Sequence, residues 1–371
     1  MDRFALGHAS GSEWSQVVAE CVTQIGPLPP TANIGFVYFT ENFVAHATRI
    51  VSDLKQRTGI ESWVGTAGAG ILATGREYYG EPGIVVMIGG FPSDSFNVFT
   101  LDQSGVEGFV DSNSAWLEAN GHHFGIIHAD PRHTDLDTAI PTFVEATNSF
   151  LVGGITSSSD SFSQIANSVT ESPFSGVLFA GDINVVSGLT QGCTPVGPMH
   201  EVTSCQGNVA ISIDGRPALD VLKEDIGELL ARDLRRIGGY IYAGLPVAGS
   251  DQADYLVRNL LGLDAERGLV AVAASLDEGA RVMFCRRDTQ SAYDDLVRML
   301  DDVSGRITSP PRGAVYYSCV ARGPGMFGAD SAELRTIAEK IGDIPLVGFF
   351  CNGEISHDRL YGYTGVLSLF T

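Results

Sequence analysis

Two hydrophobic runs near opposite ends of the chain share one pattern of apolar and polar positions. Trp63–Ile71 and Leu346–Ile355 both begin with a hydrophobic residue followed by Val-Gly, and both soon change to small and polar residues. After a polar stretch, a Tyr-Gly turn leads into a second apolar segment, Tyr79–Ile88 or Tyr361–Phe370. Short apolar runs bounded by turn residues are typical of β-strands, so each copy predicts two strands. The polar residues between the strands are candidates for binding.

Each copy is preceded by a further predicted strand and an amphipathic helix. The strands are Ile34–Phe39 and Ala314–Val320, and apolar residues then recur at helical spacing. Asp330 and Glu333 have the spacing of a capping box at the start of the second helix. The apolar positions of the two helices are Phe43, Ala47, Ile50, Val51 and Leu54 in the first copy and Leu334, Ile337, Ala338 and Ile341 in the second.

A weaker third copy lies between these two. It has the strand Phe124–His128, a helix around Phe143, the strand Leu151–Ile155 and a later strand, Gly176–Ala180. The repeated unit is βαββ, although short apolar runs can also resemble one another by chance. Alternating strands and helices predict an α/β fold, and the short turns between strands predict mixed sheets. We expect two pseudo-repeated halves in an αββα layered arrangement, with the helices outside the sheets.

The middle of the chain contains two features that bear on domain organisation. Thr156–Ser172 is rich in serine, aspartate and asparagine, which predicts a mobile or ligand-covering loop. Ser187–Pro198 is punctuated by glycine and proline and leads into a predicted hairpin, Val202–Ile213. A helix follows Asp214. We therefore place a domain boundary before the hairpin, giving residues 1–200 and 201–371.

Composition and charge narrow the class of protein. The 371 residues are 44% hydrophobic and 18% charged, as in an ordinary globular chain. The net charge of −21 argues against nucleic acid and anionic membrane as partners, because both would repel the chain at long range. The start lacks an apolar signal segment, and no run is long enough to cross a bilayer. We expect a soluble cytoplasmic protein with reduced cysteines, because the six cysteines are far apart and form no CxxC pair.

Four motifs in a fixed order resemble the FIST domain family. They are Gln191–Pro198, Asp214–Leu222, Ser318–Gly323 and Pro345–Ile355. The resemblance covers almost the whole chain, with a FIST N-like part to about residue 200 and a FIST C-like part after it. It implies a cytoplasmic sensory module that binds a small molecule, such as an amino acid, and reports to a signalling protein partner.

Two other motifs resemble ligand-binding motifs, one for phosphate and one for a metal, but their sequence context argues against both. The glycine run Gly65–Gly70 lacks the helix N-terminus that phosphate-binding loops require, so we interpret it as close backbone packing with exposed amides as a secondary ligand site. His128–Asp135 alternates imidazole and carboxylate side chains, which suits a metal, but Pro131 favours a structural loop. We predict no metal site and no cofactor.

Cys319 and Cys351 are the candidate nucleophiles for an alternative function, that of an enzyme. Each ends a predicted strand, and a cysteine-dependent hydrolase or transferase could use either thiol as its nucleophile. Such a thiol needs a base and a lowered pKa, and only His357 is near in sequence. The competing interpretation is a buried small hydrophobe. We therefore name no catalytic residue and expect a non-catalytic protein.

Arg322 and Glu354 are the strongest candidates for ligand binding. Each closely follows an apolar strand, where a charge is costly unless it is partnered. The guanidinium suits a carboxylate, and Glu354 and Asn352 suit an ammonium group, so an amino-acid-like ligand would fit. The structural alternative is that Arg322 pairs with Glu354 or Glu333 only to hold the fold. The predicted site consists of Thr66, Ala67, Gly68, Ser157, Ser158, Arg322, Cys351, Asn352 and Glu354.

Overall fold

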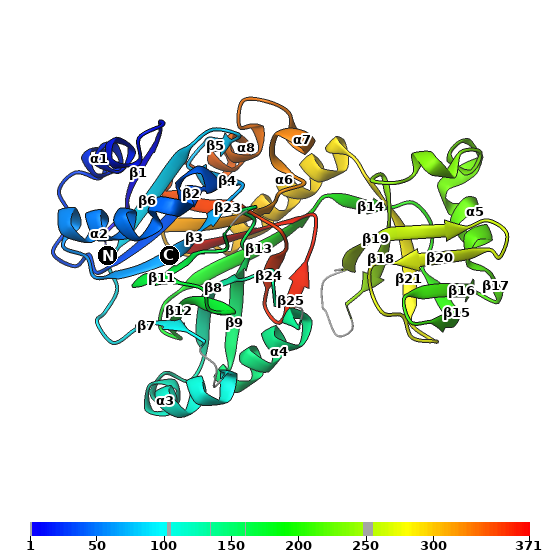
Figure 1. The fold of residues 1–371 in the computed structure, drawn as a ribbon, viewed down its shortest axis with the longest axis horizontal. Helices are drawn as coiled ribbons and strands as arrows, with labels where there is room; N and C mark the ends of the chain where they lie inside the picture. Colours follow the sequence, from blue (N-terminus) through cyan, green and yellow to red (C-terminus); the bar gives the residue numbers. More distant parts are fainter. Residues whose placement is uncertain (1, 102–104, 134, 160, 248–254) are drawn as a thin grey trace. The chain divides into compact units, whose positions relative to one another are not determined.

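The chain forms two compact units of mixed α/β structure, which confirms the predicted fold class (Figure 1). The structure is a computed structural model that describes residues 2–101, 105–133, 135–159, 161–247 and 255–371. Unit 1 consists of Met1–Thr190 and Leu296–Thr371, and unit 2 of Gln191–Asp295. In sequence, unit 2 is therefore an insertion into unit 1.

Unit 1 contains three copies of one supersecondary unit. Each copy runs strand, helix, strand, helix, strand, hairpin, strand. The first consists of β1 (Ala5–Ser10), α1 (Trp14–Ile25), β2 (Ile34–Thr40), the 3-10 helix η1 (Glu41–His46), α2 (Ala47–Thr58), β3 (Ser62–Gly68), the hairpin β4 (Gly70–Ala73) and β5 (Arg76–Tyr79), and β6 (Gly83–Gly89). The second consists of β7 (Phe96–Thr100), α3 (Gly105–Asn120), β8 (His123–Ala129), α4 (Leu136–Thr147), β9 (Ser149–Ile155), the hairpin β10 (Gln164–Ala166) and β11 (Ser168–Thr170), and β12 (Phe174–Ala180).

The third copy is interrupted by unit 2 after its first strand. It consists of β13 (Val185–Gln191), α6 (Thr289–Arg306), β22 (Gly313–Cys319), the short α7 (Gly323–Phe327), α8 (Ala332–Ile341), β23 (Leu346–Cys351), the hairpin β24 (Glu354–Ser356) and β25 (Arg359–Tyr361), and β26 (Thr364–Phe370). The strands predicted from Trp63 and Leu346, β3 and β23, occupy equivalent sheet positions, which confirms the repeat. The copy that is weakest in sequence is as complete as the other two.

In each of the three sheets of unit 1, the two strands at one edge come from another copy. The strand orders are β1-β6-β2-β3-β10-β11, β25-β24-β9-β8-β12-β7 and β13-β26-β22-β23-β4-β5. A parallel pair lies inside each sheet, and a hairpin from a different copy pairs with its second strand. The hairpin of the first copy joins the sheet of the third copy, and the hairpin of the third copy joins the sheet of the second. The hairpin of the second copy joins the sheet of the first. We call this cyclic arrangement the hairpin exchange.

The Val-Gly signature has a steric cause. In each parallel pair, a Cβ on the glycine would lie well inside van der Waals distance of the carbonyl oxygen of the neighbouring strand. Only glycine allows this close approach. The prediction that the glycines of Gly65–Gly70 serve close backbone packing is confirmed at Gly65. The three glycines and the residues whose carbonyls they face are Gly65 with Val37, Gly153 with Ile127 and Gly348 with Tyr316.

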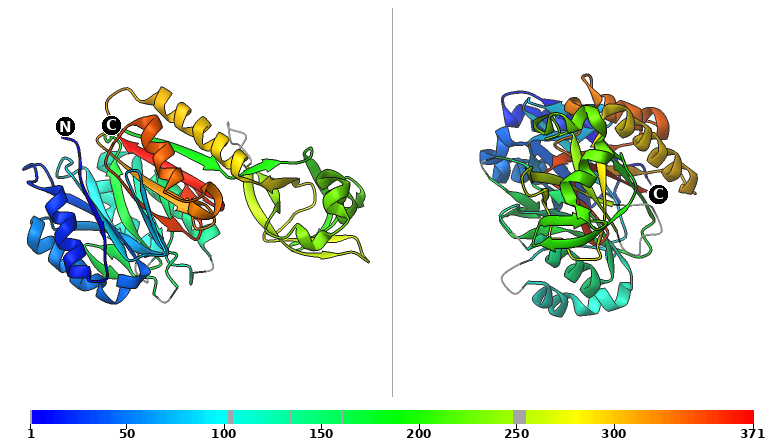
Figure 2. Two further views of the ribbon diagram at one scale, coloured as in Figure 1. Left: turned by 90° about the horizontal axis from the view of Figure 1, so that it is seen from above. Right: turned by 90° about the vertical axis from the view of Figure 1, so that its right-hand side faces the viewer.

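The inner faces of the three sheets share one hydrophobic core, and helices cover the outer faces. Side chains from every sheet contribute to the core, including Phe36, Ile126 and Val315. Separate apolar clusters join each outer face to its helices: α1 and α2, α3 and α4, and α6 and α8. Figure 2 shows these helices outside the strands. Unit 1 thus has three sheets facing one core, where the sequence led us to expect two, because the copy that is weakest in sequence, β7 to β12, is a full repeat.

The serine-rich stretch Thr156–Ser172 is more ordered than its composition suggests. It contains the β10–β11 hairpin, which pairs with β3, and only Asp160 lies outside the described residues. Gln164 is fully buried, accepts from Ser175 over 2.6 Å and donates to the carbonyl oxygen of Ser172 over 3.1 Å. The prediction of a mobile or ligand-covering loop is wrong for residues 164–170, because these residues form paired strands of a sheet.

Unit 2 is built on a closed antiparallel barrel. Six strands pair in a ring, because β21 pairs with both β15 and β18, and α5 packs against the core inside. The predicted hairpin Val202–Ile213 is confirmed. His200 is nearly buried and contacts two carboxylates, Asp214 at 2.6 Å and Asp225 at 2.9 Å. The elements are β14 (Cys193–Pro195), β15 (His200–Gln206), β16 (Val209–Ile213), β17 (Arg216–Pro217), α5 (Ala218–Ala231), η2 (Leu234–Arg236), β18 (Ile241–Pro246), β19 (Tyr255–Asp264), β20 (Leu269–Val272) and β21 (Arg281–Arg287).

Candidate functional site

The ends of β3, β9 and β23 meet at one end of the core of unit 1. The hydroxyl oxygens of Thr66 and Thr156 lie 2.9 Å apart. The backbone N–H of Asn352 donates to the carbonyl oxygen of Ile155 over 3.0 Å. Each of the three copies therefore supplies one strand end to a common polar cluster, which we call the strand-end cluster.

Ser157 connects strand ends of all three copies within this cluster. Its hydroxyl accepts from the backbone N–H of Ala69 over 2.9 Å and donates to the carbonyl oxygen of Phe350. A single side chain from the second copy thus bonds to backbone of the first and third. Of the predicted site residues, the structure brings Thr66, Ser157 and Asn352 together here.

The other predicted residues lie around the cluster in different roles. Ala67 and Gly68 form the buried end of β3, and Cys351 forms the buried end of β23. The Ser158 hydroxyl donates to the carbonyl oxygen of Ser161, within its own loop. These residues supply backbone and shape rather than free polar side chains.

Arg322 is fully buried and paired with Glu333. Its Nε and Nη2 atoms both lie 2.8 Å from Oε1 of Glu333, and its guanidinium carbon lies 4.9 Å from the centre of the Phe327 ring. Burial by itself lowers the pKa of Arg322, but Glu333 and Tyr316 together raise this pKa by more, so the guanidinium stays charged. Glu333 also accepts from Tyr316 over 2.6 Å and from Ser318. The structural alternative considered for Arg322, a pair with Glu333, is present.

The predicted capping box at the start of α8 is wrong. Glu333 turns inward to Arg322, and Ser331, with a positive φ of 56°, is the N-cap residue in place of Asp330. Glu77 of the exchanged β4–β5 hairpin takes over, because its Oε1 accepts from the backbone N–H of Leu334 over 3.4 Å. Burial, together with the nearby Glu333 carboxylate, raises the pKa of Glu77 to about 7. A helix of the third copy is therefore capped by the first.

Glu354 is a fully buried carboxyl group at the start of β24. Its Oε2 accepts from the Thr364 hydroxyl over 2.8 Å and from the Thr364 backbone N–H over 3.2 Å. Burial raises the pKa of Glu354 to about 8, although Thr364 and the charge of Arg322 act in the opposite direction. At neutral pH this side chain is largely a neutral carboxylic acid, which can donate as well as accept.

Three buried polar atoms near the C-terminal ends of β22 and β23 have neither a hydrogen-bond nor an ion-pair partner among the described residues. They are Nη1 of Arg322, Oε1 of Glu354 and Oε2 of Glu77. The Arg322 charge lowers the pKa of both carboxyl groups, so the three side chains lie within electrostatic reach of one another. Buried polar atoms are nearly always hydrogen-bonded, so these three exceptions need a physical explanation.

Replacing Glu354 by glutamine is expected to remove a pH dependence of stability. The folded protein holds the Glu354 proton to about pH 8, whereas the ordinary pKa is 4.5, so its contribution to stability falls as pH rises to 8. Between pH 6.5 and pH 9 the wild type should lose about 2 kcal/mol more than Glu354→Gln. Urea unfolding at several pH values measures this difference. Equal pH profiles for the two proteins would contradict the raised pKa.

A second buried polar group lies in the middle of the shared core. The Tyr38 hydroxyl lies 3.1 Å from Nε2 of His128 and 2.9 Å from the Tyr317 hydroxyl, and all three residues are fully buried. Burial lowers the pKa of His128 to about 3, so the ring is neutral. The sequence analysis missed this triad. The repeat nevertheless indicates it, because the three residues occupy equivalent positions in the three copies. Each one directly follows the residue that pairs with the glycine of the Val-Gly motif in its copy.

The loop from His128 to Asp135 does not gather metal ligands in the part of the chain that the structure describes. His128 points into the core triad, and Asp130 is held by Arg132, whose Nη2 lies 2.5 Å from Oδ2. Thr134 lies outside the described residues. Across the described ranges, no group of three or more histidine, cysteine, aspartate or glutamate side chains is arranged to hold a metal ion.

The two candidate nucleophiles sit in surroundings that suppress their reactivity. Burial, together with the nearby Glu354 carboxyl group, raises the pKa of Cys319 to about 12. Burial raises the pKa of Cys351 well above its ordinary value too. Because the thiolate is the nucleophile, both shifts oppose attack on a substrate.

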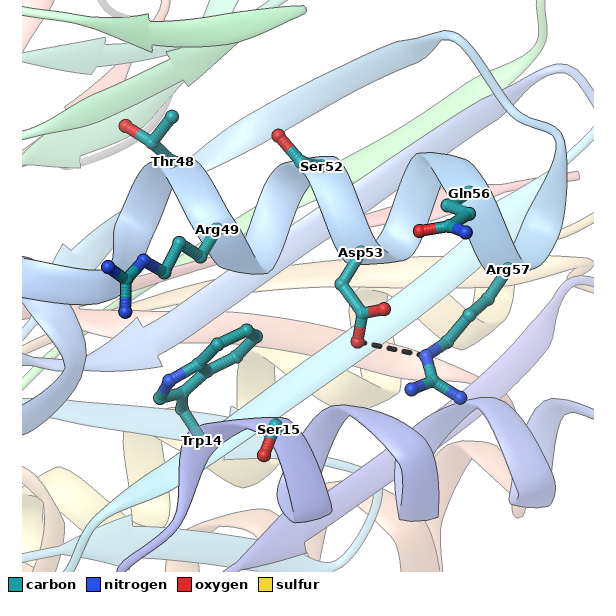
Figure 3. Close-up of a pocket in the computed structure, with 8 residues that line it drawn as sticks. All are labelled: Trp14, Ser15, Thr48, Arg49, Ser52, Asp53, Gln56 and Arg57. Carbon is teal, nitrogen blue, oxygen red and sulfur yellow. Dashed lines mark hydrogen bonds and ion pairs between the residues drawn. The ribbon is translucent and has the colours of Figure 1, made fainter.

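Unit 1 also carries two open cavities away from the strand ends. One of about 420 Å³ lies between the starts of α3 and α4, with Leu101 and Phe174 in its wall. The other, of about 340 Å³, lies on the outer surface between α1 and α2, and we call it the α1–α2 groove. Figure 3 shows Trp14 on one side of it and Arg49 and Arg57 on the other.

Comparison with known proteins places the chain in a family. Residues 33–216 match the family model of the FIST N domain, and residues 218–357 match that of the FIST C domain. The chain belongs to the FIST family. An uncharacterized protein of Mycobacterium tuberculosis is 31% identical over 327 residues, which is 83% of each chain. An uncharacterized protein of Mycobacterium bovis is 30% identical over 355 residues, which is 88% of each chain.

Membership confirms the resemblance seen in the sequence motifs. FIST domains are sensory, ligand-binding domains of signalling systems. In the described ranges, none of the helices combines the length and the apolar character needed to cross a bilayer. The division at residue 200 and the residues of the ligand site stay predictions.

Proposed function

We propose that this FIST protein is a non-catalytic cytoplasmic sensor that binds a small amino-acid-like molecule at the strand ends of the third copy. The observation that carries the proposal is the set of unpartnered polar atoms on Arg322, Glu354 and Glu77. They combine one cationic donor with carboxyl groups of raised pKa. The ligand-binding character of FIST domains supports the same reading.

The chemistry of these atoms suits a zwitterion. Nη1 of Arg322 is available for a carboxylate oxygen, since the other guanidinium face is held by Glu333. Oε1 of Glu354 is available for an ammonium group, and ammonium beside it would favour the charged carboxylate over the neutral acid. Asn352, whose backbone is fixed on Ile155, adds an amide near the same strand end. Ligand binding should therefore release a proton from Glu354 near pH 7.

A thermal-shift screen of amino acids and related metabolites tests the proposal. A ligand at about a hundredfold over its dissociation constant should stabilise the fold by about 2.7 kcal/mol. Glu354→Gln should weaken that ligand by removing the charge that receives the ammonium group. Glu118→Gln, an exposed substitution on α3, is the matched control and should bind like the wild type.

Two results would reject this site. Affinity unchanged in both Glu354→Gln and Arg322→Lys, for a ligand that stabilises the wild type, would place binding elsewhere. Turnover of any screened compound that is lost in Cys319→Ser or Cys351→Ser would favour the cysteine-dependent enzyme instead. The raised pKa of both thiols argues against that outcome. A signalling protein that reads the bound state is part of the proposal.

A further inference from the structure

The α1–α2 groove combines an unneutralised cation with an aromatic ring. The chain carries a net charge of −21, yet α2 contains three cationic residues and one acidic one. Two of the cations have partners: Arg57 donates to Asp53 over 2.8 Å, and Lys55 lies 3.0 Å from Glu61. No ion pair of Arg49 is found among the described residues, and its guanidinium is exposed at the groove. A single positive charge is therefore available to a ligand there.

Trp14 supplies the flat surface opposite this charge. It is the first residue of α1, is half-buried, and stacks on His46 with ring centres 5.9 Å apart and a tilt of 24°. Figure 3 shows its ring between the two helices, directed toward the Arg49 side, whereas the Ser52 hydroxyl projects from α2 on the side away from Trp14. The ring is thus held in place by one neighbour while it lines the groove.

We infer that the α1–α2 groove is a second binding site, which takes a small monoanion carrying a flat ring, such as an aromatic carboxylate. One unpaired guanidinium matches one carboxylate, because Arg57 is already engaged by Asp53. The indole ring offers stacking to an aromatic body. The volume of about 340 Å³ lies at the lower end of the range of small-molecule sites. The site goes beyond the proposed sensory pocket and shares no residue with it.

Fluorine NMR of the full chain labelled with 5-fluorotryptophan tests the inference directly. The protein has three tryptophans, and Trp14→Phe identifies the resonance of Trp14. Benzoate should shift this resonance saturably and leave that of the fully buried Trp63 unchanged. Acetate, which lacks the ring, and benzyl alcohol, which lacks the charge, should each bind at least about tenfold more weakly.

Two variants of α2 separate a site from a general charge effect. Arg49→Gln should weaken benzoate by about tenfold or more, because it removes the charge-assisted hydrogen bond. Lys55→Gln removes the same charge from the same helix at a residue that is not part of the groove lining, and should stay within about twofold of the wild type. An unmoved Trp14 resonance, or equal losses in the two variants, would overturn the inference. Because the signal is read at Trp14, neither result depends on the amino-acid screen.

Discussion

Gly348→Ala is expected to destabilise unit 1 by at least about 4 kcal/mol, enough to prevent folding in a domain of ordinary stability. The new Cβ would overlap the carbonyl oxygen of Tyr316, which belongs to the backbone of the neighbouring parallel strand and cannot rotate away. Relief requires the two strands of the pair to separate in the middle of the sheet. Urea unfolding followed by circular dichroism, or the soluble yield if the variant does not fold, measures the effect.

Gly305→Ala is the matched control for this substitution. Gly305 lies in α6, and an added Cβ there meets no atom of the described residues within 4 Å. Alanine is the better helix former, so this variant should gain about 0.5–1 kcal/mol. Gly153→Ala, at the equivalent position of the second copy, should behave like Gly348→Ala. If Gly348→Ala matched the wild type in stability, the steric account of the Val-Gly signature would fail.

Arg322→Met should cost about 3–5 kcal/mol of stability, because it removes the cation that neutralises a buried carboxylate. Methionine has a similar length and is apolar, so the loss reflects charge more than packing. Glu333 would keep its hydrogen bonds from Tyr316 and Ser318 but would lie uncompensated near Glu77. Lower pH should restore part of the loss, since a protonated carboxyl group is cheaper to bury. Urea midpoints at pH 6 and pH 8 measure both effects.

Two further variants test how much the Arg322–Glu333 ion pair contributes to stability. The double variant Arg322→Met with Glu333→Gln should recover part of the stability, because no unpaired charge remains. Arg335→Met, on the exposed face of α8, should change stability by less than about 0.5 kcal/mol. A cost for Arg322→Met as small as that for Arg335→Met would mean that the pair contributes little and that Arg322 is held for another reason.

The sequence was most informative where one local constraint recurs. The Val-Gly motif appears in every copy because backbone atoms of a parallel pair approach too closely for any side chain at Gly65, Gly153 or Gly348. The buried faces of the helices were predicted equally well, since apolar residues at helical spacing cover the outer sheet surfaces. These features depend largely on neighbours in the same copy, and the apolar pattern indicates them directly.

The hairpin exchange could not be read from the same pattern. The polar break after β3 contains short strands whose apolar positions fit any sheet edge, and nothing local tells which edge they join. The misassigned capping box has the same origin, because the residue that caps α8, Glu77, comes from the first copy. For the candidate site, Thr66, Ser157 and Asn352 were found together, whereas the partner of Arg322 could only be offered as an alternative.

The hairpin exchange sets a condition on how the chain is made in the cell. The Thr74 hydroxyl, in the turn between β4 and β5, donates to the carbonyl oxygen of Ile344, which lies 270 residues later. A ribosome that adds about 5–20 residues per second needs roughly 15–55 s to reach that partner. During this interval the nascent chain carries a two-stranded hairpin with open edges, which invites pairing with other chains. We therefore expect co-translational chaperone binding to concentrate on the β4–β5 segment until the last strands emerge.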